Sequence, residues 1–357
     1  MAIWKRFKAT RLLLAILSAS ASLVGGAAPL HAADKIWPSR ARSAADYLDR
    51  QWGAPADWRG AQPWQRFVIV DALIEYQLRT GDHRWNARIA AAVRNRAGLY
   101  GNDDDLWAVI ASLHAWQLDH DPALLAYASA TYRRIVTSYW DDRCGGGLWW
   151  NQTRGYKNAI TNELLIYVSA EMFLATGQEG YRDWALRSWS WFAQSSMIGQ
   201  GGLVNDGLGS DCRNNGQPRY TYNQGVLIGA LNDLSKVTGD PQYRALAVKT
   251  ALSATRLLTT PGGILREPFE ALGADGPMFK GVFAYHLGHL AADLPGGPDR
   301  QELVAWIDRN AGAVWQTSGA GSGTIDGDWS GGMSAPGAAA QASGIDMLVA
   351  AIPAATP

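Results

Sequence analysis

Residues 78–90, LRTGDHRWNARIA, carry the pattern that decides the fold. A helical pattern ends at Thr-Gly, a short polar turn follows, and an aromatic residue opens the next helix. The design returns at residues 174–189 (LATGQEGYRDWALRSW) and 237–251 (VTGDPQYRALAVKTA), with a degenerate copy at 117–130 (QLDHDPALLAYASA). Glycine after a helix supplies the positive φ that a tight C-terminal turn requires. Copies spaced roughly 40 to 60 residues apart indicate stacked helical hairpins.

Apolar residues at three- and four-residue spacing continue along nearly the whole chain, which predicts about twelve helices. Such hairpins bury their apolar faces either in an open solenoid or in a closed ring. Short Thr-Gly turns alternate with long glycine-rich loops, such as residues 141–157 (DDRCGGGLWWNQTRGYK) and 198–222. Long loops in compact domains usually serve function. Six hairpins with the long loops on one rim describe an all-α (α/α)6 barrel, and we expect one domain over residues 34–357.

The first 33 residues have the pattern of a secretory signal peptide. Four basic residues precede the apolar run LLLAILSASASLVGG, and a small-residue cleavage site ends at Ala32. The run is too short for a membrane span. We therefore expect a secreted or periplasmic protein with no membrane span. Removing the segment leaves 28 basic and 32 acidic residues of the original 32 and 32, a net charge of −4, which disfavours nucleic acid and anionic lipid as partners.

Two cysteines, Cys144 and Cys212, either form one disulfide in an oxidising compartment or remain separate thiols. Two cysteines alone do not make a closed zinc site, and the six histidines show no metal-ligand spacing, so neither a metal nor a cofactor is expected. The 17 tryptophans and 13 tyrosines must mostly lie in the core, but this aromatic load also suits a protein whose ring faces stack on sugars.

Residues 100–116, YGNDDDLWAVIASLHAW, place three carboxylates ahead of an apolar helix. A single aspartate there would simply cap the helix. Three adjacent carboxylates repel one another, and repulsion raises one pKa. Glycoside hydrolysis needs two carboxyl groups with different pKa values, so that one is ionised while the other is protonated. Capping and catalysis both remain open on these residues alone.

The same segment resembles the Asp-Asp motif of the endo-α-1,6-mannanases of glycoside hydrolase family 76. Further stretches match that family in order: GGLWW with KNAITNELL, YTYNQGVLIGAL, ILREPFE, FKGVFAYHL, and DWSG followed by QASGIDML. The resemblance implies an (α/α)6 barrel and a retaining mechanism. It makes Asp103 the nucleophile and Asp104 the general acid/base, with Asp105 as helix N-cap. The third acid leaves Asp104/Asp105 as an alternative register, and Ala108 stands where many members have a second tryptophan.

Side chains near these motifs are expected to contact substrate: Trp107, Trp150, Asn158, Tyr222, Asn223, Gln224, Asp275 and Lys280. Of the adjacent Trp149 and Trp150, one should be core and the other a sugar platform. Asn162 shares the rim with Asn158 and is open to either capping or substrate contact. Lys280 and Asp275 match the family's lysine motif, as a salt bridge or as substrate contacts. Glu267 and Glu270 are expected to be surface or structural acids.

The function that follows is an exported, monomeric endo-α-1,6-mannosidase acting on α-1,6-linked mannan or mannooligosaccharides. Transglycosylation by the same machinery is an alternative, because water and a sugar acceptor use the same base. A non-catalytic mannan-binding protein is another, although a binder has no need of repelling carboxylates. Other (α/α)6 enzymes, such as unsaturated-uronide hydrolases and sugar epimerases, share the fold and are not excluded by it.

Overall fold

The computed structural model describes residues 32–54, 57–199, 201–269, 273–318, 321–332 and 336–353. The expected signal peptide, apart from its last two residues, lies outside this set, as does Glu270.

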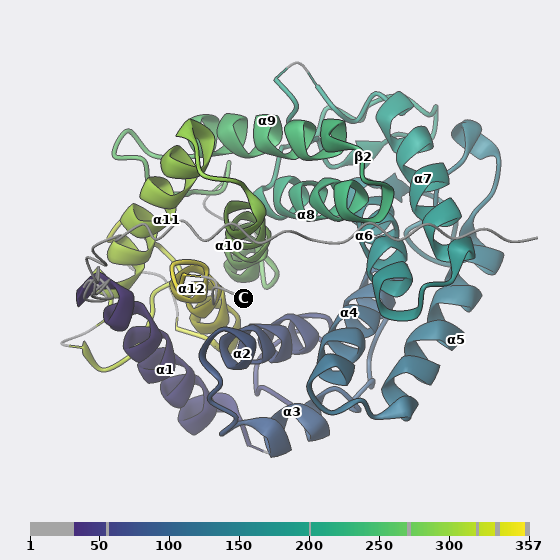
Figure 1. Cartoon of the computed structure of the whole chain (residues 1–357). Coiled ribbons are helices and arrows are strands. Elements are labelled where there is room, and N and C mark those ends of the chain that lie inside the picture. Colours follow the sequence, from purple (N-terminus) through teal and green to yellow (C-terminus); the bar gives the residue numbers. More distant parts are fainter. Residues whose placement is uncertain are drawn as a thin grey trace, which may run out of the picture.

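The described chain forms twelve α-helices arranged as two concentric rings (Figure 1). The outer ring is α1 (Ala32–Trp52), α3 (Asn86–Ala92), α5 (Pro122–Tyr139), α7 (Glu179–Gln194), α9 (Pro241–Leu257) and α11 (Pro298–Gln316). The inner ring is α2 (Gln65–Thr80), α4 (Asn102–Asp119), α6 (Ala159–Thr176), α8 (Thr221–Thr238), α10 (Gly276–Asp293) and α12 (Ala338–Ala350). Each inner helix packs on the next, and α12 packs on α2, which closes the ring. The predicted (α/α)6 barrel is confirmed.

The Thr-Gly turns join inner to outer helices at one end of the barrel. Each of their glycines has a left-handed φ and donates its N–H to the carbonyl four residues earlier: Gly81 (φ 70°), Gly177 (φ 67°) and Gly239 (φ 74°). In the degenerate copy His120 takes the same conformation at φ 55°, with its N–H bonded to the Trp116 carbonyl. The repeated turn therefore has one backbone geometry, and the fourth copy reaches it without glycine.

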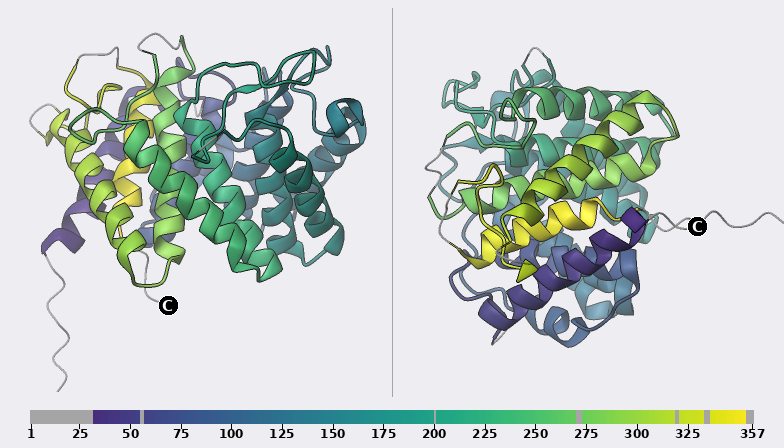
Figure 2. Two further views of the ribbon diagram at one scale, coloured as in Figure 1. Left: turned by 90° about the horizontal axis from the view of Figure 1, so that it is seen from above. Right: turned by 90° about the vertical axis from the view of Figure 1, so that its left-hand side faces the viewer.

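The long loops gather at the opposite end, along one edge of the molecule in the left view of Figure 2. Three of them contain an antiparallel bridge: Trp140–Leu148, Ile198–Val204 and Thr259–Leu265. In each case the second bridge residue donates its N–H to a buried helix amide: Leu148 to Asn162 (2.7 Å), Val204 to Gln224 (2.8 Å) and Leu265 to Asn310 (2.9 Å). We call these amides clamps. They fix the direction in which each loop continues over the barrel mouth.

Two of the loops are also joined to each other. The strands β1 (Lys157–Asn158) and β2 (Gly207–Leu208) pair antiparallel, and Cys144 and Cys212 form a disulfide with Cα atoms 5.2 Å apart. Beneath the loops, α6 is buried without a break from Ala159 to Ala170, as an inner helix enclosed on all sides must be. No helix in the described ranges is both long and apolar enough to cross a membrane.

Candidate active site

The three aspartates all lie inside the first turn of α4, because the helix begins at Asn102 with Gly101 as its N-cap. The expectation that Asp105 caps the helix is therefore wrong. The helix starts earlier because Asn102 is held by the neighbouring loop, donating its N–H to the Trp150 carbonyl (2.8 Å) and its side-chain amide to the Trp149 carbonyl (2.7 Å). A Cβ on Gly101 would collide with the side chains of Asp103 and Trp150, so glycine is needed at this close approach.

The three carboxylates then diverge around the helix. Asp103 accepts a hydrogen bond from Trp150 Nε1, which lies 3.0 and 3.2 Å from its two oxygens. Asp104 Oδ2 accepts the Tyr100 N–H at 3.0 Å. Asp105 instead forms a 2.6 Å ion pair with Arg134 of the outer helix α5. This arrangement favours Asp103 and Asp104 as the working pair over Asp104 and Asp105.

Both carboxyl groups of the pair are far less acidic than ordinary aspartates. Burial, followed by repulsion from Asp104, raises the pKa of Asp103 to about 8. Burial also raises the pKa of Asp104 to about 6, with further contributions from the charges of Asp105 and Asp275. At intermediate pH the pair therefore holds one proton, which is the state that a nucleophile and a general acid require together.

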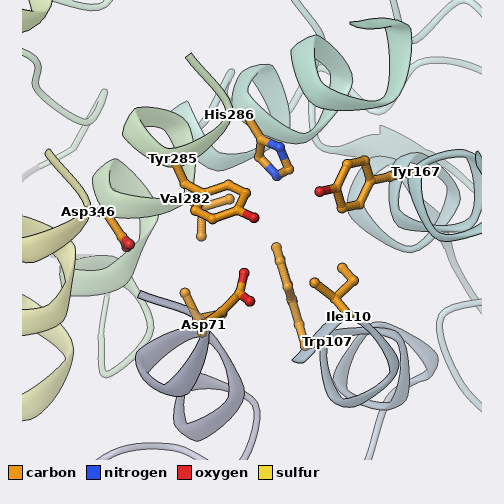
Figure 3. Close-up of a pocket in the computed structure, with 9 residues that line it drawn as sticks. Asp71, Trp107, Ile110, Tyr167, Val282, Tyr285, His286 and Asp346 are labelled. Atoms are coloured by element: carbon orange, nitrogen blue, oxygen red, sulfur yellow. The ribbon is translucent and has the colours of Figure 1, made fainter. Parts of the chain in front are cut away.

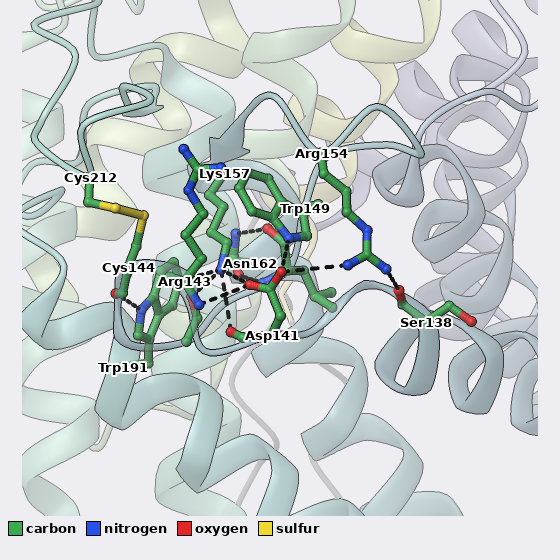
Figure 4. Close-up of polar contacts among 12 residues, drawn as sticks. Ser138, Asp141, Arg143, Cys144, Trp149, Arg154, Lys157, Asn162, Trp191 and Cys212 are labelled. Carbon is green, nitrogen blue, oxygen red and sulfur yellow. Dashed lines mark hydrogen bonds and ion pairs between the residues drawn. A yellow bond between two sulfur atoms is a disulfide. The ribbon is translucent and has the colours of Figure 1, made fainter.

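The loop that carries Trp150 rests on an internal polar network (Figure 4). Buried Lys157 donates to Asp141 Oδ1 (2.9 Å) and to the carbonyls of Arg143 and Gly146, each at 2.6 Å. Trp149 donates its Nε1–H to Asp141 Oδ2 at 2.6 Å and lies under the Lys157 ammonium. Of the adjacent tryptophans, Trp149 is thus the buried one, and Trp150 faces the site.

The inner helices α6 and α8 contribute polar residues of two kinds. Asn162 and Gln224 are clamps whose amides are bonded to loop and helix backbone, so the expected substrate contact of Gln224 gives way to a structural role. Asn158 is the N-cap residue of α6, yet its side chain makes no cap bond. Its Oδ1 and both amide atoms of Asn223 are buried without a hydrogen-bond partner among the described residues. Tyr222 donates its hydroxyl to Asp206 Oδ1 at 3.3 Å.

On the opposite side of the mouth, Asp275 and Lys280 do not form a salt bridge, which was one of the two alternatives expected for them. Asp275 Oδ1 accepts the indole N–H of Trp64 at 2.7 Å. Lys280 is buried, donates to the Gly327 carbonyl at 2.5 Å, and lies over the Trp329 ring. The two side chains therefore separate, with Asp275 near Asp104 and Lys280 fixing a loop.

Glu267 has a structural role at the start of α8, which was one of the two roles expected for it, the other being a surface position. Its carboxyl group accepts hydrogen bonds from the backbone N–H (3.1 Å) and the hydroxyl of Thr221. Burial raises its pKa to about 7.

Trp107 lies one helical turn below Asp103, in the floor of the site rather than on its rim. It is 7% exposed, and its ring stacks on Trp64 with centroids 6.0 Å apart. It also lines a small internal cavity with Tyr167 and Tyr285 (Figure 3). Trp107 thus separates the carboxylate pair from the lower part of the barrel.

Sequence reasoning missed Asp206, Tyr156 and Glu163. Asp206 accepts the Tyr156 hydroxyl at 2.5 Å, and Glu163 is fully buried beside it with a pKa raised well above the ordinary value by burial and then by the charge of Asp206. A signal for Asp206 was present. The hexapeptides GGGLWW, GGLVND and GGILRE, at residues 145–150, 201–206 and 262–267, share their glycines and their clamped aliphatic residue. The last residue of each hexapeptide lies two positions after its clamped residue. These last residues are Trp150, Asp206 and Glu267.

Within the described ranges, no group of three histidine, cysteine, aspartate or glutamate side chains is placed to hold a metal ion.

Comparisons with known proteins agree with this geometry. The chain is 26% identical over 289 residues to mannan endo-1,6-alpha-mannosidase DCW1 of Saccharomyces cerevisiae, covering 72% of this chain and 64% of the relative. It is 27% identical to the Candida albicans protein of the same name over 74% of this chain and 62% of the relative. The chain thus spans less than two thirds of the length of these curated relatives.

Among solved structures, an inactive variant of the α-1,6-mannanase GH76A of Salegentibacter sp. HEL1_6, with two consecutive aspartates replaced by alanine and α-1,6-mannotetrose bound, matches with a TM-score of 0.79. The match has 25% identity and covers 88% of this chain and 98% of that one. The model of glycosyl hydrolase family 76 matches residues 40–354, and the chain therefore belongs to glycosyl hydrolase family 76.

Proposed function

We propose that this chain is an exported glycoside hydrolase that cleaves α-1,6-mannosidic bonds by a retaining mechanism. The observation that carries the proposal is the pair of adjacent carboxyl groups, Asp103 and Asp104, which lie in the first turn of α4 at the loop end of the barrel and whose pKa values burial raises. Two kinds of relative support the substrate. The fungal relatives are named mannan endo-1,6-alpha-mannosidases, and the Salegentibacter mannanase binds an α-1,6-mannooligosaccharide in a variant made inactive at two consecutive aspartates.

In the proposed reaction Asp103 attacks the anomeric carbon, and Asp104 protonates the leaving glycosidic oxygen. In the free protein the higher pKa belongs to Asp103, so the shared proton starts on the proposed nucleophile. The transition state carries positive charge at the anomeric carbon, which favours the ionised form of the carboxylate that faces it. The state that reacts therefore has Asp103 ionised and the proton on Asp104. Asp104 later deprotonates the water that releases the sugar from Asp103.

The remaining cleft residues divide by what they touch. Trp150 orients Asp103 through its indole N–H and presents a half-buried ring at the rim. Tyr222, Asn158 and Asn223 lie on the α6 and α8 side, where buried amide atoms lack protein partners in the described chain, and we assign them to sugar hydroxyls. Asp275 lies on the α10 side, near Asp104.

The test is incubation with linear α-1,6-mannooligosaccharides while NMR follows the anomeric configuration of the first product. We expect shorter oligosaccharides that appear first as the α-anomer. Asp103→Asn and Asp104→Asn should each lose nearly all activity. Asp105→Asn is the matched control and should stay within a few-fold of the parent, because its partner is Arg134 on the outer helix.

Three outcomes would contradict the proposal. Absence of cleavage together with tight binding would make the chain a mannan-binding protein. Products longer than the substrate in the mass spectrum would identify transglycosylation. Activity that survives Asp103→Asn but not Asp105→Asn would move the pair to Asp104 and Asp105.

A further inference from the structure

The carboxylate of Asp206 is held over the barrel mouth more firmly than a loop side chain ordinarily is. Two residues earlier, Val204 is clamped by Gln224. The Asp206 carbonyl accepts the N–H of Ala159 at 2.8 Å, and the next residues form β2 against β1. The disulfide through Cys212 ties the same loop to the one that carries Trp150. These contacts fix the backbone on both sides of Asp206.

The side chain has neutral partners. Tyr156 donates to Asp206 Oδ2 at 2.5 Å and Tyr222 donates to Oδ1 at 3.3 Å, while Tyr156 itself is oriented by an amide N–H of Asn215 at 3.0 Å. No ion pair involving Asp206 occurs in the part of the chain that the structure describes. A carboxylate offers about four lone-pair positions, so two tyrosine donors leave about two acceptor positions unused. Asp206 is also half-buried rather than closed off.

Asp206 and Asp103 are both held by residues of the loop that contains Trp150: this tryptophan donates its indole N–H to Asp103 and its backbone N–H to the Tyr156 carbonyl (2.9 Å), and the Tyr156 hydroxyl donates to Asp206. The charges of Asp206 and of Asp103 both raise the pKa of Tyr222, after the effect of burial, so the tyrosine hydroxyl lies within electrostatic range of both acids. The buried amide of Asn223 follows Tyr222 in the same helix and has no partner among the described residues. Asp206 and the tryptophan that holds Asp103 therefore share the α6 and α8 side of the barrel mouth.

We propose that Asp206 is a specificity-determining residue that accepts hydrogen bonds from two neighbouring hydroxyls of the sugar attacked by Asp103. The inference rests on the proposed glycosidase function and adds a residue to it. Two hydroxyls on adjacent ring carbons fit the two oxygens of one carboxylate. In an α-1,6-linked chain the hydroxyls at carbons 2, 3 and 4 of each sugar are free, so every internal residue of the chain offers such a pair. Hydrogen bonds to a charged acceptor are the stronger kind.

The experiment pairs enzyme variants with altered substrates. Asp206→Asn and Asp206→Ala are compared with the parent on aryl α-1,6-mannobiosides, intact or lacking one hydroxyl of the sugar that bears the aryl group. We expect kcat/KM on the intact substrate to fall roughly 10- to 100-fold in Asp206→Ala. Removing either of two adjacent hydroxyls from the substrate should lower the kcat/KM of the parent by a similar factor. The same removal should lower the kcat/KM of Asp206→Ala less than threefold. Asp211→Asn changes an exposed side chain of the same loop that accepts the Arg213 N–H, and this variant is the matched control that should behave as the parent does.

Three readings separate the outcomes. Equal losses on every deoxy substrate in parent and Asp206→Ala would overturn the inference, as would kcat/KM within twofold of the parent in both Asp206 variants. A purely structural role would lower the melting temperature and weaken all substrates alike, which also counts against it. If the parent cleaves no α-1,6-mannoside, the proposed function fails, and calorimetry with α-1,6-mannotetraose decides the inference separately. Weaker binding by Asp206→Asn supports it, whereas equal affinity or no binding by the parent overturns it.

Discussion

Replacing Asp103 with asparagine should stabilise the protein, and the gain should depend on pH. Burial and the charge of Asp104 raise the pKa of Asp103 from 3.8 to about 8. As pH rises from about 4 to 8, the unfolded chain releases this proton first, so the folded state binds more protons and loses stability. Stability from Asp103 is thus present below its unfolded pKa and is lost as pH rises through its folded pKa. Asparagine does not ionise and escapes this loss.

The size of the gain follows from the shift. A change of about four pKa units corresponds to at most about 6 kcal/mol, at about 1.4 kcal/mol for each unit. The gain should be smaller than this maximum for two reasons. Part of the pKa shift comes from repulsion by Asp104, which stays buried in the variant. Asparagine also keeps only one of the two oxygens that face Trp150. We therefore expect Asp103→Asn to raise the free energy of unfolding by about 2–4 kcal/mol at pH 9 and by almost nothing at pH 4, which is roughly 3–6 °C in melting temperature at high pH.

Urea unfolding at a series of pH values between 4 and 9, for the parent and Asp103→Asn, measures the effect directly. Asp105→Asn is the control, because it breaks a pair whose Arg134 side chain is 46% exposed and should cost about 1 kcal/mol or less. A gain of the same size at pH 4 and pH 9, or none at pH 9, would refute the claim that the folded protein forces Asp103 to keep its proton.

Other predictions concern the support of the same pair. Trp150→Phe removes the indole N–H from Asp103, whose pKa is the higher of the pair, so the alkaline limb of the kcat/KM profile should move up by about one pH unit, and an unmoved limb would show that the bond does not tune the carboxyl group. Gly101→Ala should lower kcat/KM at least about tenfold while the melting temperature falls by only a few degrees, because the new methyl group meets side-chain atoms of Asp103 and Trp150 rather than backbone. Replacing Cys144 and Cys212 with alanine opens a loop closed across 68 residues and should cost about 2–5 kcal/mol, measured by urea unfolding. Equal stability of the parent and this double variant would contradict that estimate.

The barrel was predictable because its information is local. Apolar spacing marks each helix, and a glycine such as Gly177 marks the turn that ends one. The alternation of short and long connections then distinguishes the two ends of the ring. The loop conformations were less predictable, since their geometry depends on contacts between segments far apart in sequence. The disulfide between Cys144 and Cys212 is one such contact, and two cysteines alone left it open.

The site was predictable only where a motif named its residues. Asp103 and Asp104 could be placed by resemblance, but the ion pair that turns Asp105 outward depends on Arg134 from another helix. An amide at the start of an inner helix has several uses with the same local sequence. Gln224 clamps a loop, whereas the amide of Asn223 beside it has no protein partner in the described chain. Only the packing of the loops distinguishes these two neighbours.

The interior of the barrel shows why Asp103, at the mouth, retains a proton while Glu75 does not. Burial by itself raises the pKa of any carboxyl group, and at the mouth no cation is among the main influences on Asp103. Deeper in the barrel, burial acts on Glu75 in the same way, but His289 and Arg79 outweigh it and hold the pKa of Glu75 well below its usual range. Trp107 lies between the two levels, one turn below Asp103 and stacked on a second tryptophan. The effect of burial that His289 and Arg79 outweigh at Glu75 is left uncompensated at Asp103, so the Asp103 carboxyl group stays protonated near neutral pH.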